Sequence, residues 1–337
     1  LIICASAAHA ARAQTPTPIP MQTPTPTSTS TSTSTTSMST STSTPTSQTT
    51  PAPSPVPSPA PAATPAEWLD ARVRAEVTAF SGNVYLYAKN LDTGATYSLR
   101  GDERVRTAST IKLAVMVEAF ARVAEGRARW TDELTLTKEK KVGGAGILPE
   151  LSDGLKITLR DAVRLMMTLS DNTATNLVID VLTADAVNAR MDSLGLKETR
   201  LMRKVFGGGE STEGRREENK VFGLGRSSPR EMVTLMERLE RGEIVSAEAS
   251  KEMLELMKRE QGQNALGRSL WRVPKATKSG ALDLLRSNVG IIYSPKGRIA
   301  IAVTVDDMPE PVWTPDNPAF HLMSRLSEIL IDGLGKK

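Results

Sequence analysis

The sequence is poor in the side chains that bind metals through sulfur or nitrogen. Its 337 residues include one cysteine, Cys4, and two histidines, His9 and His321. Because the segment 67–337 holds no cysteine and one histidine, disulfides, thiolate metal sites and histidine-rich zinc sites are excluded from it. A Ser-His-Asp site would depend on His321, and no nucleophile-elbow sequence accompanies that residue. We therefore expect no cofactor and no metal.

Long apolar runs and dense basic clusters are also lacking. Outside the first residues, no stretch is long and apolar enough for a transmembrane helix. The net charge is +4, and no run of Lys and Arg with interleaved aromatic residues occurs, so nucleic-acid binding has little support. We expect a monomer with no nucleic-acid partner and no transmembrane span.

The first 66 residues differ in composition from the rest. Residues 1–13 are interpreted as the remnant of a secretory signal peptide, because the apolar Leu1–Ala5 precedes the small-x-small pattern Ala8-His9-Ala10. An alanine-rich terminus is the alternative, and the bulky Ile3 disfavours lipid attachment at Cys4. Residues 14–66 carry no charged or aromatic side chain and predict a disordered linker rich in Ser, Thr and Pro. The folded domain is then 67–337, and we expect it to be secreted into the periplasm or cell envelope.

The folded part has strand signals near both ends and helical signals between them. Hairpins are predicted over 83–100 and over 289–305, each with a turn sequence at its centre. Helices are predicted over 67–80, after the capping residues Thr158 and Ser228, and near the C-terminus. The last of these carries four apolar residues on one face: Leu322, Leu326, Ile329 and Leu330. The pattern predicts an α/β fold of the α+β sandwich type. Both ends of the domain would form an antiparallel sheet flanked by helices, with an all-helical lobe inserted.

Ser109 precedes an apolar run that predicts a buried helix, and Lys112 follows it by one turn. At the start of that helix both side chains would lie on one face, near the positive end of the helix dipole. Burial lowers the proton affinity of a lysine, and a nearby cation, for which Lys278 is the candidate, lowers it further. A neutral Lys112 would then take the proton from Ser109.

Three short motifs follow one another along this part of the chain. They are Ser109-Thr110-Ile111-Lys112, Ser170-Asp171-Asn172 and Lys278-Ser279-Gly280. In this order they resemble the S-x-x-K, S-D-N and K-T-G motifs of class A β-lactamases and penicillin-binding serine hydrolases. The segment Thr168–Asn176 is similar to that family as well, and we judge the resemblance to run from Glu67 to the end.

The resemblance implies a role for each motif. Ser109 is the nucleophile, Lys112 its base, and Ser170 passes the proton on to the leaving nitrogen. Asn172 donates to the acylamino carbonyl of the substrate.

Lys278-Ser279 is expected to lie on an edge strand and to bind a substrate carboxylate. Gly280 allows a close backbone approach. The N–H groups of Ser109 and Ala281 would form the oxyanion hole. Arg286 is interpreted either as a further ligand of the substrate carboxylate or as a surface arginine.

One departure from the family is serious. The family carries a deacylating glutamate in a Glu-x-x-Leu-Asn segment, and no such segment occurs in the loop that follows Thr199. Alignment without gaps places Val205 at the glutamate position, and Glu210 is the candidate replacement. Because a positioned base contributes roughly 10²–10⁴-fold, hydrolysis of the acyl-enzyme should be slow without one.

Three functions stay open at this point. The first is a secreted serine hydrolase that opens the β-lactam amide through an acyl-enzyme on Ser109, with slow deacylation. The second is a D-alanyl-D-alanine carboxypeptidase or another penicillin-binding serine hydrolase acting on a cell-wall peptide. The third is a non-catalytic module of the cell envelope.

Overall fold

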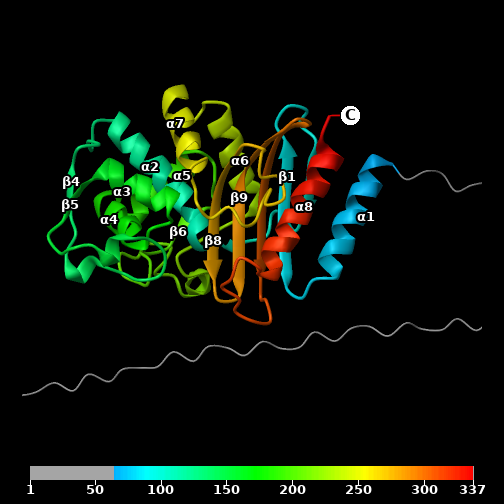
Figure 1. The fold of residues 1–337 in the computed structure, drawn as a ribbon. Helices are drawn as coiled ribbons and strands as arrows, with labels where there is room; N and C mark the ends of the chain where they lie inside the picture. Colours follow the sequence, from blue (N-terminus) through cyan, green and yellow to red (C-terminus); the bar gives the residue numbers. More distant parts are fainter. Residues whose placement is uncertain (1–63, 337) are drawn as a thin grey trace, which may run out of the picture. The chain divides into compact units, whose positions relative to one another are not determined.

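The computed structural model describes residues 64–336 (Figure 1). The predicted leader, 1–13, and all but the last residues of the predicted linker, 14–66, lie outside this range and stay predictions. The described part begins with helix α1, Pro65–Thr78, two residues before the predicted domain start at Glu67. The difference arises because Thr64 and Glu67 form a reciprocal capping box around Pro65 at the first helical position.

A five-stranded antiparallel sheet is formed by strands from both ends of the described chain. Its strands lie in the order β2-β1-β10-β9-β8. Their bounds are β1 Asn83–Asn90, β2 Thr96–Leu99, β8 Lys275–Leu282, β9 Leu285–Ser294 and β10 Gly297–Asp306. Both predicted hairpins are present, and β1 pairs with β10 along its whole length. The predicted sheet is therefore confirmed.

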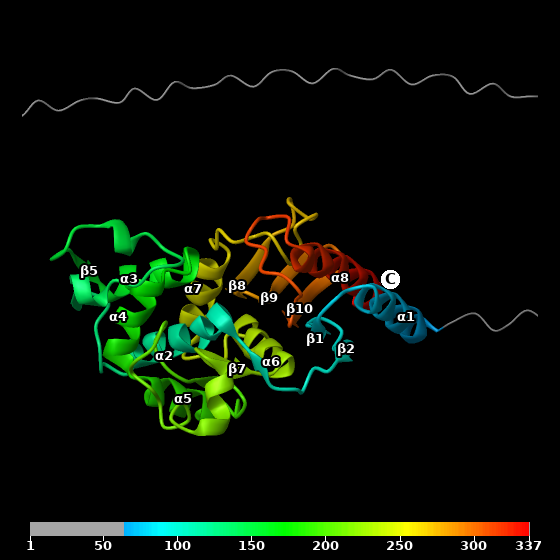
Figure 2. The ribbon, with the colours of Figure 1, turned by 90° about the horizontal axis from the view of Figure 1, so that it is seen from below.

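Helices cover both faces of this sheet. Figure 2 shows α1 and α8, Pro318–Leu334, on one face and α6, Pro229–Glu240, on the other. The face toward α8 holds Leu86, Ile301 and Val303, whereas Tyr87 and Ala302 belong to the cluster that includes α6. The predicted apolar face of α8 is buried, which closes the core on that side.

The inserted region between β2 and β8 is mostly helical and lies beside the sheet in Figure 1. Besides α6 it contains α2 Lys112–Ala124, α3 Leu159–Thr168, α4 Asn172–Leu182, α5 Ala184–Ser193 and α7 Ala247–Met257. The predicted caps Thr158 and Ser228 start α3 and α6. Within the range 64–336, no helix is long and apolar enough to cross a membrane.

The sequence predicted an all-helical inserted lobe, but the inserted region is not purely helical. It also holds two small antiparallel sheets and four 3₁₀ turns. The sheets are β3-β7-β6, with β3 Val105–Arg106, β6 Arg200–Leu201 and β7 Gly225–Ser227, and β4-β5, with β4 Glu133–Thr135 and β5 Lys156–Thr158. The turns are η1 Ala108–Ile111, η2 Lys138–Lys140, η3 Leu148–Glu150 and η4 Glu217–Phe222. Strands of two or three residues lack the alternating apolar pattern by which longer strands are predicted.

Candidate active site

Ser109 lies in the 3₁₀ turn η1, immediately before α2, rather than in the first turn of an α-helix. The carbonyl of Thr107 accepts hydrogen bonds from Thr110 N at 3.2 Å and Thr110 Oγ1 at 2.8 Å, which tightens the chain here. Ala108 has a φ of +46°, in the left-handed region that side chains disfavour. Such strain costs about 1–3 kcal/mol and is characteristic of functional sites.

The edge strand β8 passes directly against the backbone of this turn. A Cβ atom on Gly280 would lie 2.7 Å from Thr107 O and 3.0 Å from Ser109 N, so only glycine fits. The close approach predicted at Gly280 is therefore made to the turn that carries Ser109. Ser279 N points away from β9 and donates to the carboxylate of Glu260, which lies beyond the free edge of the sheet. Because alternate residues of a strand point their N–H groups to the same side, Ala281 N faces that edge too. This places the two predicted oxyanion-hole donors in the same region.

Lys112 connects the first two motifs. Its side chain is fully buried, and Nζ donates to Ser170 O at 2.6 Å, to Ser170 Oγ at 3.2 Å and to Asn172 Oδ1 at 3.0 Å. Burial is the main cause that lowers the pKa of Lys112 well below its usual value, and the positive charge of Lys278 lowers it further. The geometry thus brings a lysine with a lowered pKa within hydrogen-bond distance of the Ser170 hydroxyl.

The second motif is held in place by Asp171. Its carboxylate accepts from Ala174 N at 2.8 Å, which caps α4, and from Ile147 N at 2.7 Å and Leu148 N at 2.9 Å. This clamp fixes the loop 142–148 beside Ser170, whose φ of +55° is again left-handed. Sequence reasoning gave Asp171 no such role, because its partners are backbone groups of a distant loop.

Asn172 bridges Lys112 and the same loop. Its Oδ1 accepts from Lys112, as described above, and its Nδ2 donates to Gly143 O at 3.0 Å. An amide nitrogen carries two hydrogens, so one N–H is left over for a substrate carbonyl. The predicted substrate contact stays a prediction, and the structure adds a positioning contact to it.

Lys278 and Ser279 lie in the middle of β8 and share a carboxylate that the sequence analysis did not identify. Lys278 Nζ, Ser279 N and Ser279 Oγ each donate to Glu260 Oε1 at 2.7 Å, and Thr277 Oγ1 donates to Glu260 Oε2 at 3.0 Å. Both side chains of the Lys278–Glu260 ion pair are buried, with exposures of 0% and 1%. Glu260 follows α7 in a segment with no motif, so no local signal identified it.

Arg286 is a structural residue, and its interpretation as a surface arginine is wrong. It is 1% exposed, and its guanidinium donates to the backbone carbonyls of Leu282, Leu285 and Val312. Its Cζ also lies 4.6 Å from the ring centre of Trp313. Three of its five N–H groups donate to these carbonyls, two of which flank the β8–β9 turn, so we assign Arg286 to fastening this turn rather than to the substrate carboxylate.

The loop that carries Val205 is fixed from α4. Asn176 Nδ2 donates to Val205 O at 3.2 Å, and Val205 N donates to Asn176 Oδ1 at 2.8 Å. Val205 is half-buried, whereas Glu210 is exposed and its Oε1 accepts from Gly208 N at 3.1 Å. No contact links Glu210 to Lys112 or Ser170 in residues 64–336, so nothing here places it as the replacement base.

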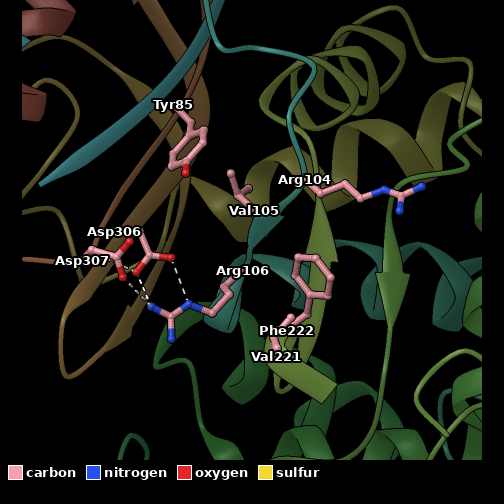
Figure 3. A pocket seen from close by; sticks show the side chains of 8 residues that line it. All are labelled: Tyr85, Arg104, Val105, Arg106, Val221, Phe222, Asp306 and Asp307. Carbon is pink, nitrogen blue, oxygen red and sulfur yellow. Dashed lines mark hydrogen bonds and ion pairs between the residues drawn. The ribbon is translucent and has the colours of Figure 1, made fainter. Parts of the chain in front are cut away.

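A separate pocket of about 290 Å³ opens next to β3 (Figure 3). It is lined by Tyr85, Arg104, Val105, Arg106, Val221, Phe222, Asp306 and Asp307. Arg106 Nε donates to Asp306 Oδ2 at 2.9 Å, so its charge is already paired. None of the predicted site residues lines this pocket. Across the described residues, no group of three or more His, Cys, Asp or Glu side chains is arranged to hold a metal.

Comparison with known proteins matches the fold described above. The model of the β-lactamase enzyme family matches residues 68–334. The chain is 28% identical to β-lactamase AER-1 of Aeromonas hydrophila over 228 residues, covering 66% of this chain and 72% of that protein.

Solved structures give the same picture. A β-lactamase of Sphaerobacter thermophilus superposes with a TM-score of 0.69 and 28% identity, covering 80% of this chain and 97% of that one. The protein PBP-A superposes with a TM-score of 0.67 and 27% identity, covering 78% and 94%. A point mutant of PBP-A, solved as an acyl-enzyme complex with penicillin G, gives a TM-score of 0.67 and 26% identity, covering 79% and 96%. Since the family model spans most of its length, the chain belongs to the β-lactamase enzyme family.

Proposed function

We propose that this chain is a serine hydrolase that opens the β-lactam amide by forming an acyl-enzyme on Ser109 and clears that acyl-enzyme slowly. The observation that supports acylation best is the buried Lys112 hydrogen-bonded to Ser170. The observation that supports slow clearance is Val205, held by Asn176 at the position that alignment without gaps gives to the family's glutamate.

Acylation begins with a proton transfer from Ser109 Oγ to the neutral Nζ of Lys112. The serine oxygen bonds to the carbonyl carbon, and the negative oxygen that results accepts from Ser109 N and Ala281 N. When the C–N bond breaks, the leaving nitrogen takes a proton from Ser170 Oγ. Ser170 recovers a proton from Lys112, which returns to its neutral state. The contact of 3.2 Å between Lys112 Nζ and Ser170 Oγ supports this last transfer.

Deacylation needs a base that activates water, and the loop 199–225 offers no carboxylate at the family position. Val205 has no titratable group, and the carboxylate of the exposed Glu210 accepts a hydrogen bond from Gly208 N in its own loop. Without a positioned base, hydrolysis of the ester loses a factor of roughly 10²–10⁴. The acyl-enzyme should therefore accumulate, which is the behaviour of a penicillin-binding protein rather than of an efficient β-lactamase.

A second candidate is a D-alanyl-D-alanine carboxypeptidase or another penicillin-binding hydrolase of cell-wall peptides. The missing glutamate favours it, because a peptide hydrolase has no need to turn over a β-lactam quickly. The same Ser109, Lys112 and Ser170 would cleave the peptide amide. Release of D-alanine from a peptide ending in D-alanyl-D-alanine distinguishes this activity from β-lactam turnover.

Intact-mass spectrometry with benzylpenicillin tests the proposal. The wild-type protein should gain the mass of one penicillin, and the Ser109→Ala variant should gain none. Nitrocefin should give a stoichiometric burst followed by slow turnover. An adduct that persists in the alanine variant, or fast turnover of nitrocefin without accumulated adduct, would contradict the proposal. If the wild type gains no mass, the chain is better described as a non-catalytic envelope module.

A further inference from the structure

Glu260 is a buried charged group of the site that the acylation chemistry above does not use. It lies three residues beyond the end of α7, and Gln261 N, next to it, donates to Thr168 O at the end of α3. The segment therefore joins the helical region to the free edge of β8. The residue is 3% exposed, and its carboxylate accepts four hydrogen bonds, all from residues 277–279.

Building on the proposed function, we propose that Glu260 is a positioning residue that pairs with Lys278 and orients it to receive the carboxylate of the substrate. An ammonium taken fully out of water is strongly disfavoured unless an opposite charge lies beside it. Glu260 Oε1, 2.7 Å from Lys278 Nζ, supplies that charge. Replacement of a single partner of such a pair leaves the other charge buried and unpaired.

Among residues 64–336, one N–H group of the buried Lys278 has no hydrogen-bond partner, and we assign that group to the substrate carboxylate. An ammonium has three N–H groups, and Lys278 uses one toward Glu260 and one toward Ser279 O at 3.0 Å. The same carboxylate holds both the N–H and the hydroxyl of Ser279, which fixes the strand edge on which Ala281 lies. Glu260 thus orders the side of the site that would face a substrate carboxylate and touches no reacting atom.

The position of Glu260 predicts a selective defect. In the Glu260→Gln variant, acylation by benzylpenicillin should slow about tenfold or more, as expected when a charge-assisted hydrogen bond is lost. Acylation by benzylpenicillin methyl ester, which lacks the carboxylate, should slow far less. A loss of general stability or of the base function of Lys112 would slow both compounds equally.

A double-mutant cycle with Lys278→Gln completes the test. If Glu260 acts through Lys278, Glu260→Gln should change acylation little when Lys278 is already Gln. Should either single variant fail to fold, the double variant, which leaves no buried charge unpaired, should still be acylated about tenfold or more slowly than the wild type by benzylpenicillin and far less slowly by the methyl ester. Glu237→Gln is the matched control. Glu237, on α6, forms an ion pair with Lys89, on β1, at 2.8 Å outside the site. Loss of this ion pair should slow neither compound selectively.

Three results would overturn the proposal. They are an equal slowing of both compounds by Glu260→Gln, additive effects in the cycle, and faster acylation by benzylpenicillin in Glu260→Gln. The last would mean that Glu260 competes with the substrate carboxylate for Lys278 and Ser279. If the wild type forms no adduct with either compound, the proposed function itself fails, which is a different outcome.

Discussion

Introducing a glutamate at position 205 should convert slow clearance of the acyl-enzyme into faster turnover. The backbone of Val205 is held by two hydrogen bonds to Asn176, of 2.8 and 3.2 Å, that do not depend on its side chain. Val205 is half-buried, so its side chain is not enclosed in the core. We expect the substitution to change the free energy of unfolding by no more than about 1 kcal/mol.

The magnitude follows from what a positioned base contributes. General-base catalysis supplies about 10²–10⁴-fold, which corresponds to about 2.7–5.4 kcal/mol of activation free energy at 1.36 kcal/mol per tenfold. A glutamate introduced at position 205 has no partner groups selected to adjust its pKa, so we use the lower end of this range of rate enhancement. Val205→Glu should therefore shorten the lifetime of the benzylpenicillin adduct about 100-fold.

The assay follows loss of the penicillin adduct by intact mass after free benzylpenicillin has been removed. Val205→Gln is the matched control, since it has the size of glutamate without its basicity, and it should keep the wild-type lifetime. Glu210→Gln should also leave the lifetime unchanged. An unchanged lifetime in Val205→Glu would refute the assignment of position 205, and a longer lifetime in Glu210→Gln would identify Glu210 as the base.

Three further predictions concern the electrostatics and packing around the site. Lys278→Gln removes a positive charge that lowers the pKa of Lys112, so that pKa rises. Acylation requires neutral Lys112, and the acidic limb of its rate measured with the methyl ester should therefore move to higher pH. Gly146→Ala would place a Cβ atom 2.2 Å from the carboxyl carbon of Asp171, the residue that caps α4, and Gly146 has a φ of +117°. It should lower the free energy of unfolding in urea by about 3 kcal/mol, against about 1 kcal/mol for Gly154→Ala, which meets no atom within 4 Å. Arg286→Ala should cost about 3 kcal/mol in the same measurement, since it leaves buried carbonyls without donors, while the rate ratio between benzylpenicillin and its methyl ester stays unchanged. A changed ratio would return Arg286 to the substrate site.

The parts of the fold that depend on local sequence were predictable. The turn between β1 and β2 and the caps at Thr158 and Ser228 act within a few residues, and each marks the expected element. The apolar stripe of α8 gave its buried face in the same way. The order of the three motifs carried the family assignment, because it combines residue type with spacing.

The parts that depend on distant contacts were not predictable. Arg286 is buried because carbonyls from two separate loops converge on its guanidinium, and nothing near it in sequence indicates this. Glu260 is one of several glutamates after α6, and only the approach of β8 distinguishes it from the exposed ones. The clamp by Asp171 likewise requires the loop 142–148 to be folded against α4.

The lifetime of the acyl-enzyme on Ser109 tests the central claim most directly, because it examines the nucleophile and the missing base together. Wild-type protein mixed with benzylpenicillin should form one adduct, mapped by peptide mass to the segment that contains Ser109. That adduct should persist after free drug is removed. An adduct that maps elsewhere, or one that hydrolyses as fast as it forms, would contradict the account.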